Sequence, residues 1–123
     1  MTRTFHPKPE LQIRLVSGHD IVLGPGKADL LAAIQDLGSI TAAAKSLGIS
    51  YKKAWQLLVT MNRHFPEPLV DTEVGGNQRG GAVLTPYGRD VLTLYRALER
   101  RIAPDQADEA RTLLDSIPDP DRD

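Results

Sequence analysis

The apolar positions of the chain change period several times, and each change marks an expected element. Residues 11–16 alternate apolar and polar side chains, residues 17–20 have turn chemistry, and residues 21–23 form a short β-favouring run. This pattern predicts a β-hairpin. Apolar residues then recur at helical spacing from Lys27 to Leu37, which predicts a core helix. Lys27, at its start, could reach phosphate, and a solvated lysine is the favoured alternative.

Two short helical patterns meet at Gly48. The first helix is expected to begin after Ser39 or Thr41, because either side chain can cap a helix by accepting a hydrogen bond from an exposed N–H. Ser50 offers a second cap, so the next helix is expected over about residues 51–63. A glycine between the two can take the positive φ that a short turn between helices needs. Together these signals predict a helix-turn-helix.

The second helix of this motif separates an apolar side from a polar side when its residues are placed at about 100° each. The apolar side consists of Ala54, Leu57, Leu58 and Met61, and Tyr51, Trp55 and Asn62 lie at its edge. We expect Trp55 to support the helix from its flank. The opposite side, which we expect to face outward, is polar and cationic and consists of Lys52, Lys53, Gln56, Thr60 and Arg63.

Charge along the motif is one-sided. Residues 37–66 contain no Asp or Glu, whereas they carry four cations, Lys45, Lys52, Lys53 and Arg63. A phosphate backbone is attracted to such a surface, so the pattern favours DNA binding over the alternative of a solvated helix face. Base edges or phosphates are expected at Lys52, Lys53 and Gln56, and the DNA backbone is expected at Ser39, Thr41 and Lys45.

A β-wing is expected after the motif. Two prolines, at positions 66 and 68, end helical structure, and short strands are predicted at residues 69–74 and 82–84. Their glycine-rich connection contains Asn77, Gln78 and Arg79, and it matches no phosphate-binding glycine motif. A wing commonly lies along the neighbouring groove, where arginine is attracted to negative potential. We expect this tip near DNA, and an ordinary loop is the alternative.

A long helix is predicted over residues 86–103, because Thr85 can cap it and Pro86 suits its first position. Apolar residues recur along it at spacings of three and four. A small winged domain seldom covers such a stripe, so we expect a second copy of the chain to pack there, with burial in the same chain as the alternative. The expected dimer interface consists of Tyr87, Val91, Leu94, Tyr95, Leu98 and Ile102.

The two ends of the chain differ in charge. Residues 1–103 hold 13 Lys and Arg against 9 Asp and Glu, and residues 104–123 hold 2 against 7, within a formal net charge of −1. We therefore expect a flexible arm at residues 1–10, a basic DNA-binding domain at residues 11–85, the dimerisation helix, and an acidic C-terminal helix and tail at residues 104–123.

Several other classes of protein find no support in the sequence. The chain has no cysteine, which excludes disulfides and thiolate zinc sites, and His6, His19 and His64 lack metal-ligand spacing. Neither a signal peptide nor an apolar run of about 20 residues is present. No nucleophile elbow surrounds any serine. We expect a cytoplasmic protein that is not an enzyme, contacts no membrane, and carries no metal or cofactor.

Three segments, residues 48–55, the pair Met61-Asn62 and residues 75–90, resemble the N-terminal DNA-binding domain of the ModE-type molybdate-responsive regulators, and more distantly the LysR-type regulators. The resemblance covers about residues 25–100. It implies a winged helix-turn-helix that dimerises through the long helix after the wing. It also implies DNA contacts by the recognition helix, at Ser50, Tyr51, Lys52, Lys53 and Gln56, and by the wing around Arg79.

In those regulators, molybdate is bound by separate C-terminal β-domains. About 20 residues follow the long helix in this sequence, too few for such a domain, so direct molybdate binding is not expected.

The predicted fold is α+β and mainly α: a winged helix-turn-helix with an N-terminal β-hairpin, a β-wing and a long C-terminal dimerisation helix. The predicted function is a homodimeric, sequence-specific transcriptional regulator that places a recognition helix in the major groove of duplex DNA. The alternative is a winged-helix protein-interaction module that acts through the long helix and the acidic tail. A small effector bound at the dimer seam is a third possibility.

Overall fold

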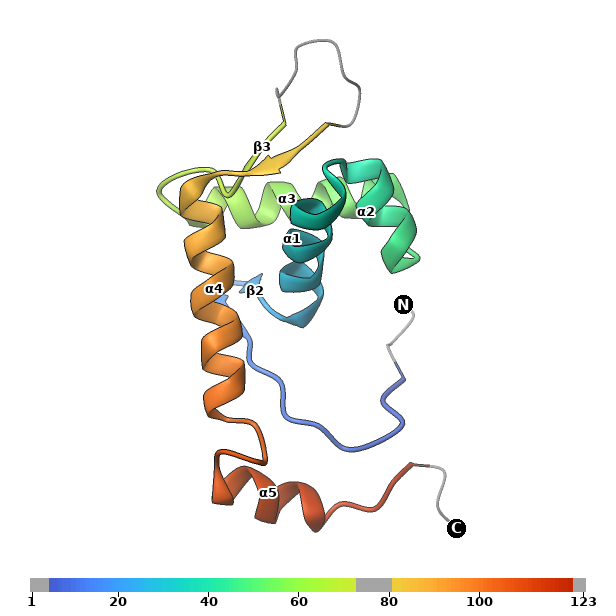
Figure 1. The fold of residues 1–123 in the computed structure, drawn as a ribbon, viewed down its shortest axis with the longest axis vertical. Coiled ribbons are helices and arrows are strands. Elements are labelled where there is room, and N and C mark those ends of the chain that lie inside the picture. Colours follow the sequence, from blue (N-terminus) through green and yellow to red (C-terminus); the bar gives the residue numbers. More distant parts are fainter. Residues whose placement is uncertain (1–4, 73–80, 121–123) are drawn as a thin grey trace. The chain divides into compact units, whose positions relative to one another are not determined.

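The computed structural model describes residues 5–72 and 81–120, drawn in colour in Figure 1. Clustering of contacts divides the chain into two compact units, Arg14–Tyr95 and a smaller unit of Met1–Ile13 with Arg96–Asp123. In chain order, the elements are β1 (Leu15–Ser17), β2 (Asp20–Leu23), α1 (Pro25–Leu37), α2 (Ile40–Leu47), α3 (Tyr51–His64), β3 (Val70–Asp71), β4 (Val83–Leu84), α4 (Pro86–Arg101) and α5 (Asp108–Asp115).

The predicted N-terminal hairpin is present but its first strand is shorter than expected. β1 pairs antiparallel with β2, and Gly18 takes a φ of 59° in the turn. Pairing becomes irregular between Leu15 and Val16, and residues 11–14 form no strand. The strand does not extend further because Leu15 pairs with Leu23, the last residue of β2, and α1 begins at Pro25.

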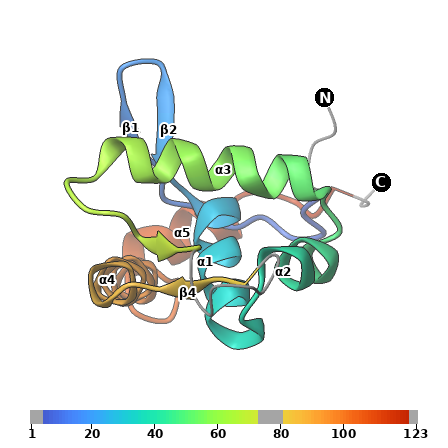
Figure 2. The same ribbon diagram turned by 90° about the horizontal axis from the view of Figure 1, so that it is seen from above.

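The core of the larger unit is built around α1, which lies between α3 and β4 in Figure 2. Leu30, Leu31 and Ile34 of α1 are fully buried, and Leu58 and Met61 of α3 are buried with them. This burial follows the helical spacing of the apolar residues in both helices. The core therefore holds α3 by one side only.

The helix-turn-helix forms as the cap and turn residues predict. Ser39 caps α2 by accepting a hydrogen bond from the backbone N–H of Ala42 at 2.9 Å. Gly48 ends α2 in the left-handed region at a φ of 69°. Ser50 then caps α3 by accepting from the N–H of Lys53 at 3.0 Å. Ser39 is thus the cap of α2, and Thr41, the other candidate, lies inside that helix.

The wing begins with two paired strands that are shorter than predicted. β3 and β4 pair Val70 with Leu84 and Asp71 with Val83. Before β4, Gly81 makes an isolated antiparallel bridge with Ser39, so the returning chain is joined to the α1–α2 turn. The predicted tip residues, Asn77, Gln78 and Arg79, lie outside the described residues.

The long helix α4 begins as predicted, because Thr85 Oγ1 accepts a hydrogen bond from the N–H of Gly88 at 2.9 Å. Its stripe is divided between burial and exposure. Tyr95, expected at a dimer interface, is 3% exposed in the single chain, so it lies in the core and not on an outer surface. Tyr87 makes an edge-on contact with Phe65, at 6.1 Å between ring centroids. Leu94 and Leu98, by contrast, are 70% and 43% exposed.

The smaller unit contains α5, which carries Asp108 and Glu109 in its first turn, where carboxylates favour the positive end of the helix dipole. Arg111 Nη2 lies 2.7 Å from Asp108 Oδ1 one turn away. Ala110 is buried. Across the two described ranges, no helix has the length and apolar content needed to cross a bilayer.

Candidate nucleic-acid interface

The outer side of α3 is open to solvent, as the sequence predicts. Ala54, Leu58 and Met61 are buried, whereas Lys52, Lys53 and Gln56 are exposed. Arg63 is exposed near the end of the same helix. The two apolar and polar sides expected from the 100° spacing are therefore the buried and exposed sides of the structure. The helix presents its cations and amide outward at no cost to the core.

Two contacts hold the C-terminal half of α3 in place. Asn62 Oδ1 accepts a hydrogen bond from the N–H of Leu69 at 2.9 Å, which joins the helix to the residue before β3. His64 Nε2 lies 2.7 Å from Asp20 Oδ2, which joins the same end to β2. Hydrogen bonding to His64 is the main reason that the pKa of Asp20 is lowered. The exposed side of α3 is thus carried on a helix fixed from both flanks.

The contact of His64 with Asp20 was not predicted from the sequence, which was searched at the histidines only for metal-ligand spacing. The two residues are 44 positions apart, and no local pattern relates them. Within the described ranges, no group of three or more His, Asp or Glu side chains could hold a metal ion.

Residues expected at the DNA backbone lie on α2 and at its cap. Thr41 and Lys45 are exposed, and Ser39 is partly exposed while its oxygen caps the helix. Ser50 holds the same position on α3 and is exposed. A hydroxyl that accepts at a cap still carries a hydrogen that it can donate to a phosphate oxygen. Both serines can therefore combine capping with an outward contact.

Lys27 is not the surface cation that its place at the start of a helix suggested. It is only 8% exposed, and its Nζ donates a hydrogen bond to the carbonyl oxygen of Ile21 on β2. Burial lowers the pKa of Lys27, an effect opposed by the nearby Asp20. The hairpin covers this amine, so Lys27 does not offer its charge at the surface.

Trp55 is more exposed than its expected supporting role requires. Its ring stacks on that of Tyr51, with 6.5 Å between centroids and 10° between planes. Val59, one turn further along α3, is also exposed and was missed by the sequence analysis. The signal that could have found it is the spacing of four residues that relates Tyr51, Trp55 and Val59.

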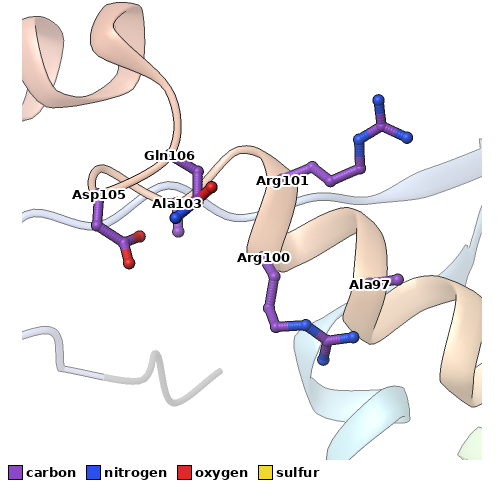
Figure 3. Close-up of a pocket in the computed structure, with 6 residues that line it drawn as sticks. All are labelled: Ala97, Arg100, Arg101, Ala103, Asp105 and Gln106. Atoms are coloured by element: carbon purple, nitrogen blue, oxygen red, sulfur yellow. The ribbon is translucent and has the colours of Figure 1, made fainter.

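Two hollows on the surface differ in what they can bind. One, of about 570 Å³, runs along the outer side of α3 and is lined by residues that include Lys53, Gln56 and Arg63. The other, of about 420 Å³, lies in the smaller unit and is shown in Figure 3. There Arg100 and Arg101 point away from each other, so they do not converge on one anion. Of these two hollows, the one along α3 carries the cations and the amide that suit a phosphate-rich ligand.

Known proteins match the same region. Residues 27–89 match the family model described as bacterial regulatory helix-turn-helix protein, lysR family. The chain is 54% identical over 70 residues to the molybdenum transport protein ModE of Azotobacter vinelandii, a match covering 57% of this chain and 26% of that protein. It is 44% identical over 80 residues to the transcriptional regulator ModE of Haemophilus influenzae, covering 65% of this chain and 31% of that one.

A third relative is the DNA-binding transcriptional dual regulator ModE of Escherichia coli, 39% identical over 89 residues that cover 72% of this chain and 34% of that regulator. The matched region thus spans about a third or less of the length of these relatives. These matches confirm the predicted resemblance to a ModE-type DNA-binding domain.

Among solved structures, the fold is similar to that of the CbnR DNA-binding domain in the crystal structure of its complex with DNA. The TM-score is 0.55 at 20% identity, over 72% of this chain and 94% of that one. At this identity the likeness shows the fold alone, and it confirms the predicted winged helix-turn-helix. With more than half of its residues matched by the family model, the chain belongs to the LysR family of bacterial regulatory helix-turn-helix proteins.

Proposed function

We propose that this chain is a sequence-specific transcriptional regulator that binds duplex DNA by placing α3 in the major groove. The observation that carries the proposal is the exposed side of α3, which presents Lys52, Lys53, Gln56 and Arg63. No Asp or Glu lies anywhere in residues 37–66. A polyanion is therefore attracted to this surface and meets no fixed negative charge within the motif.

The dimensions of α3 suit the groove. Its 14 residues give a helix about 21 Å long, and the major groove of B-DNA is about 12 Å wide, enough to admit one helix. Recognition helices contact base edges with their N-terminal residues, which here are Tyr51, Lys52 and Lys53. Ser50 and the N-terminal end of the helix dipole favour a phosphate at the same place. Gln56, one turn further, can pair with adenine through two hydrogen bonds.

The wing and α2 extend the proposed interface. We further propose that Asn77, Gln78 and Arg79, which follow β3 in the sequence and lie outside the described residues, contact the groove beside the recognition helix. Ser39, Thr41 and Lys45 contact the DNA backbone. A bacterial transcriptional regulator works where the chromosome lies, so we place its action in the cytoplasm.

We further propose that the regulator acts as a homodimer whose copies meet along α4. Leu94 and Leu98 leave apolar surface exposed on that helix, and Val91 and Ile102 are partly exposed. Two-fold symmetry would supply one recognition helix to each half of a symmetric DNA site. The relatives are named for molybdenum transport and transcription regulation, and we propose that this chain binds DNA without itself binding molybdate.

The proposal is tested by measuring DNA affinity against salt concentration for the variant Lys52→Ala/Lys53→Ala. The probe is a duplex selected by the unaltered protein from a random pool, and fluorescence anisotropy gives the dissociation constant. If both lysines contact phosphates, the slope of log K against log salt becomes shallower by about 1.8, from about 0.9 for each phosphate contact.

The matched control is Arg100→Ala/Arg111→Ala, which removes the same charge from exposed residues of the smaller unit. Its slope is expected to equal that of the unaltered protein. Equal slopes for both double variants and the unaltered protein would show that α3 is not the DNA-binding surface.

A second candidate function is a protein-interaction module that acts through α4 and the acidic residues after it. The exposure of Leu94 and Leu98 favours it. This candidate predicts no preference for any duplex in the selection, whereas the regulator predicts an enriched two-fold motif.

A further inference from the structure

Three exposed apolar side chains form a line along α3. Tyr51, Trp55 and Val59 are spaced four residues apart and are 49%, 41% and 44% exposed. Side chains four apart are neighbours on a helix surface, so the three form one continuous strip, here called the apolar ridge. The fully buried side of α3 is made by other residues, Ala54, Leu58 and Met61. Between 41% and 49% of each ridge side chain remains exposed, so the ridge offers apolar surface to a partner.

The apolar ridge lies directly beside the cationic side of α3. At 100° per residue, Val59 falls between Trp55 and the pair formed by Lys52 and Arg63. A partner that the cations attract must therefore meet Val59 and the exposed edge of Trp55 as well. This complementarity of charge selects duplex DNA as the occupant, since the same surface carries no acid that could pair with basic residues of a protein.

Apolar surface in the major groove has one chemical source. Each thymine projects its C5-methyl group there, and apolar side chains discriminate thymine by contact with that methyl. We propose that the apolar ridge, through Val59 and Trp55, contacts thymine methyl groups and so selects thymine at defined positions of the bound sequence. The inference rests on the proposed function and adds the base group that α3 recognises.

Uracil provides the direct test, because it pairs as thymine does and lacks only the methyl group. A duplex selected from a thymine pool by the unaltered protein is resynthesised with uracil at single thymine positions, and its affinity is measured by fluorescence anisotropy. At one or two positions the affinity is expected to fall about fourfold, the factor that corresponds to about 0.8 kcal/mol for one buried methyl group.

The variant Val59→Asn assigns the contact to the ridge. It replaces both methyl groups with an amide in a side chain of similar size, so the ratio of thymine to uracil affinity should approach one at the position that Val59 contacts. Trp55→Gln makes a second, independent variant. The matched control is Val16→Asn on β1, where the valine is 68% exposed and lies outside α3, and its ratio should equal that of the unaltered protein.

Two results would overturn the inference while leaving the proposed function in place. One is unchanged affinity at every single uracil position. The other is a thymine-to-uracil ratio that Val59→Asn and Trp55→Gln both leave unchanged, with circular dichroism showing that each variant is folded. Failure of the selection to enrich any sequence would instead refute sequence-specific binding itself, and the inference with it.

Discussion

A Cβ atom placed on Gly88 would lie 2.0 Å from the carbonyl oxygen of Leu69. Gly88 belongs to the first turn of α4, and Leu69 immediately precedes β3, so the helix meets the wing strand at backbone distance. Thr85 ties the same junction: its Oγ1 donates to the carbonyl oxygen of Pro68 at 2.7 Å and accepts from the N–H of Gly88 at 2.9 Å. No side chain fits at Gly88 without displacing the backbone.

Gly88→Ala is therefore expected to lower the free energy of unfolding by about 1–3 kcal/mol or more, because the added methyl overpacks a backbone contact. Urea denaturation followed by circular dichroism measures the change. The control is Gly26→Ala in α1, where a Cβ meets nothing within 4 Å, and alanine there should be neutral or stabilise by up to about 1 kcal/mol. Similar losses in both variants would contradict the close approach.

Local signals were sufficient to predict the helix-turn-helix. Ser39 and Ser50 each accept a hydrogen bond from an N–H three residues further along the chain. Gly48 needs only its own positive φ to end α2. The exposed side of α3 followed from spacing within one helix. These features depend on short stretches of sequence, and the structure agrees with the predictions for each of them.

Features that depend on distant residues were not predicted. The amine of Lys27 is covered by β2 and donates a hydrogen bond to the carbonyl oxygen of Ile21. His64 pairs with Asp20 because the hairpin lies at the end of α3. The burial of Tyr95 likewise depends on tertiary packing, which an apolar stripe alone cannot divide into core and exposed surface. The exposure of Val59 was missed because a single apolar residue on a polar side is not distinctive by itself.

The buried amine of Lys27 should make stability depend on alkaline pH. Burial lowers its pKa below the ordinary value of 10.5, so between the two values the unfolded chain binds more protons than the folded one. Stability contributed by this group therefore rises as the pH approaches 10.5. We expect Lys27→Met to remove that rise in urea denaturation at a series of pH values. The exposed control, Lys45→Met, should retain it, and identical pH profiles for all three proteins would refute the burial.

The stabilising contribution of the contact between Asp20 and His64 should be lost at acid pH. Because the pKa of Asp20 is lowered from its ordinary 3.8, its stabilising contribution is present above 3.8 and is lost as the pH falls through the lower folded value. The stability difference between the unaltered protein and Asp20→Asn should therefore shrink in that acid range. Asp119→Asn, at an exposed carboxylate beyond α5, is the control and should show no such change. If this stability difference stayed constant as the pH fell, the contact between Asp20 and His64 would not contribute to stability.

The hydrogen bond from Leu69 to Asn62 should be required for stability. Leu69 is fully buried, so Asn62→Ala leaves its N–H without the oxygen that accepts from it at 2.9 Å. An unsatisfied buried donor costs about 1–3 kcal/mol, which urea denaturation can resolve. Asn62→Asp keeps an acceptor oxygen in the same place and should retain most of the stability at neutral pH. If both variants lost the same amount, the side-chain oxygen would not be the important group.

Dimerisation along α4 can be tested by substitutions on that helix, which leave the recognition helix α3 unaltered. Leu94 and Leu98 lie four residues apart on α4 and are 70% and 43% exposed in the single chain, so burying them against a second copy removes apolar surface from water. Leu94→Glu/Leu98→Glu places like charges on both sides of that seam. We expect sedimentation velocity to show a dimer for the unaltered protein and a monomer for the variant. Affinity for a two-fold site should also fall in the variant, since each monomer reaches only one half-site.

Val16→Glu, on the exposed β1 strand, is the control and should remain dimeric. A monomeric unaltered protein at micromolar concentration, or a variant that still dimerises, would place the interface elsewhere.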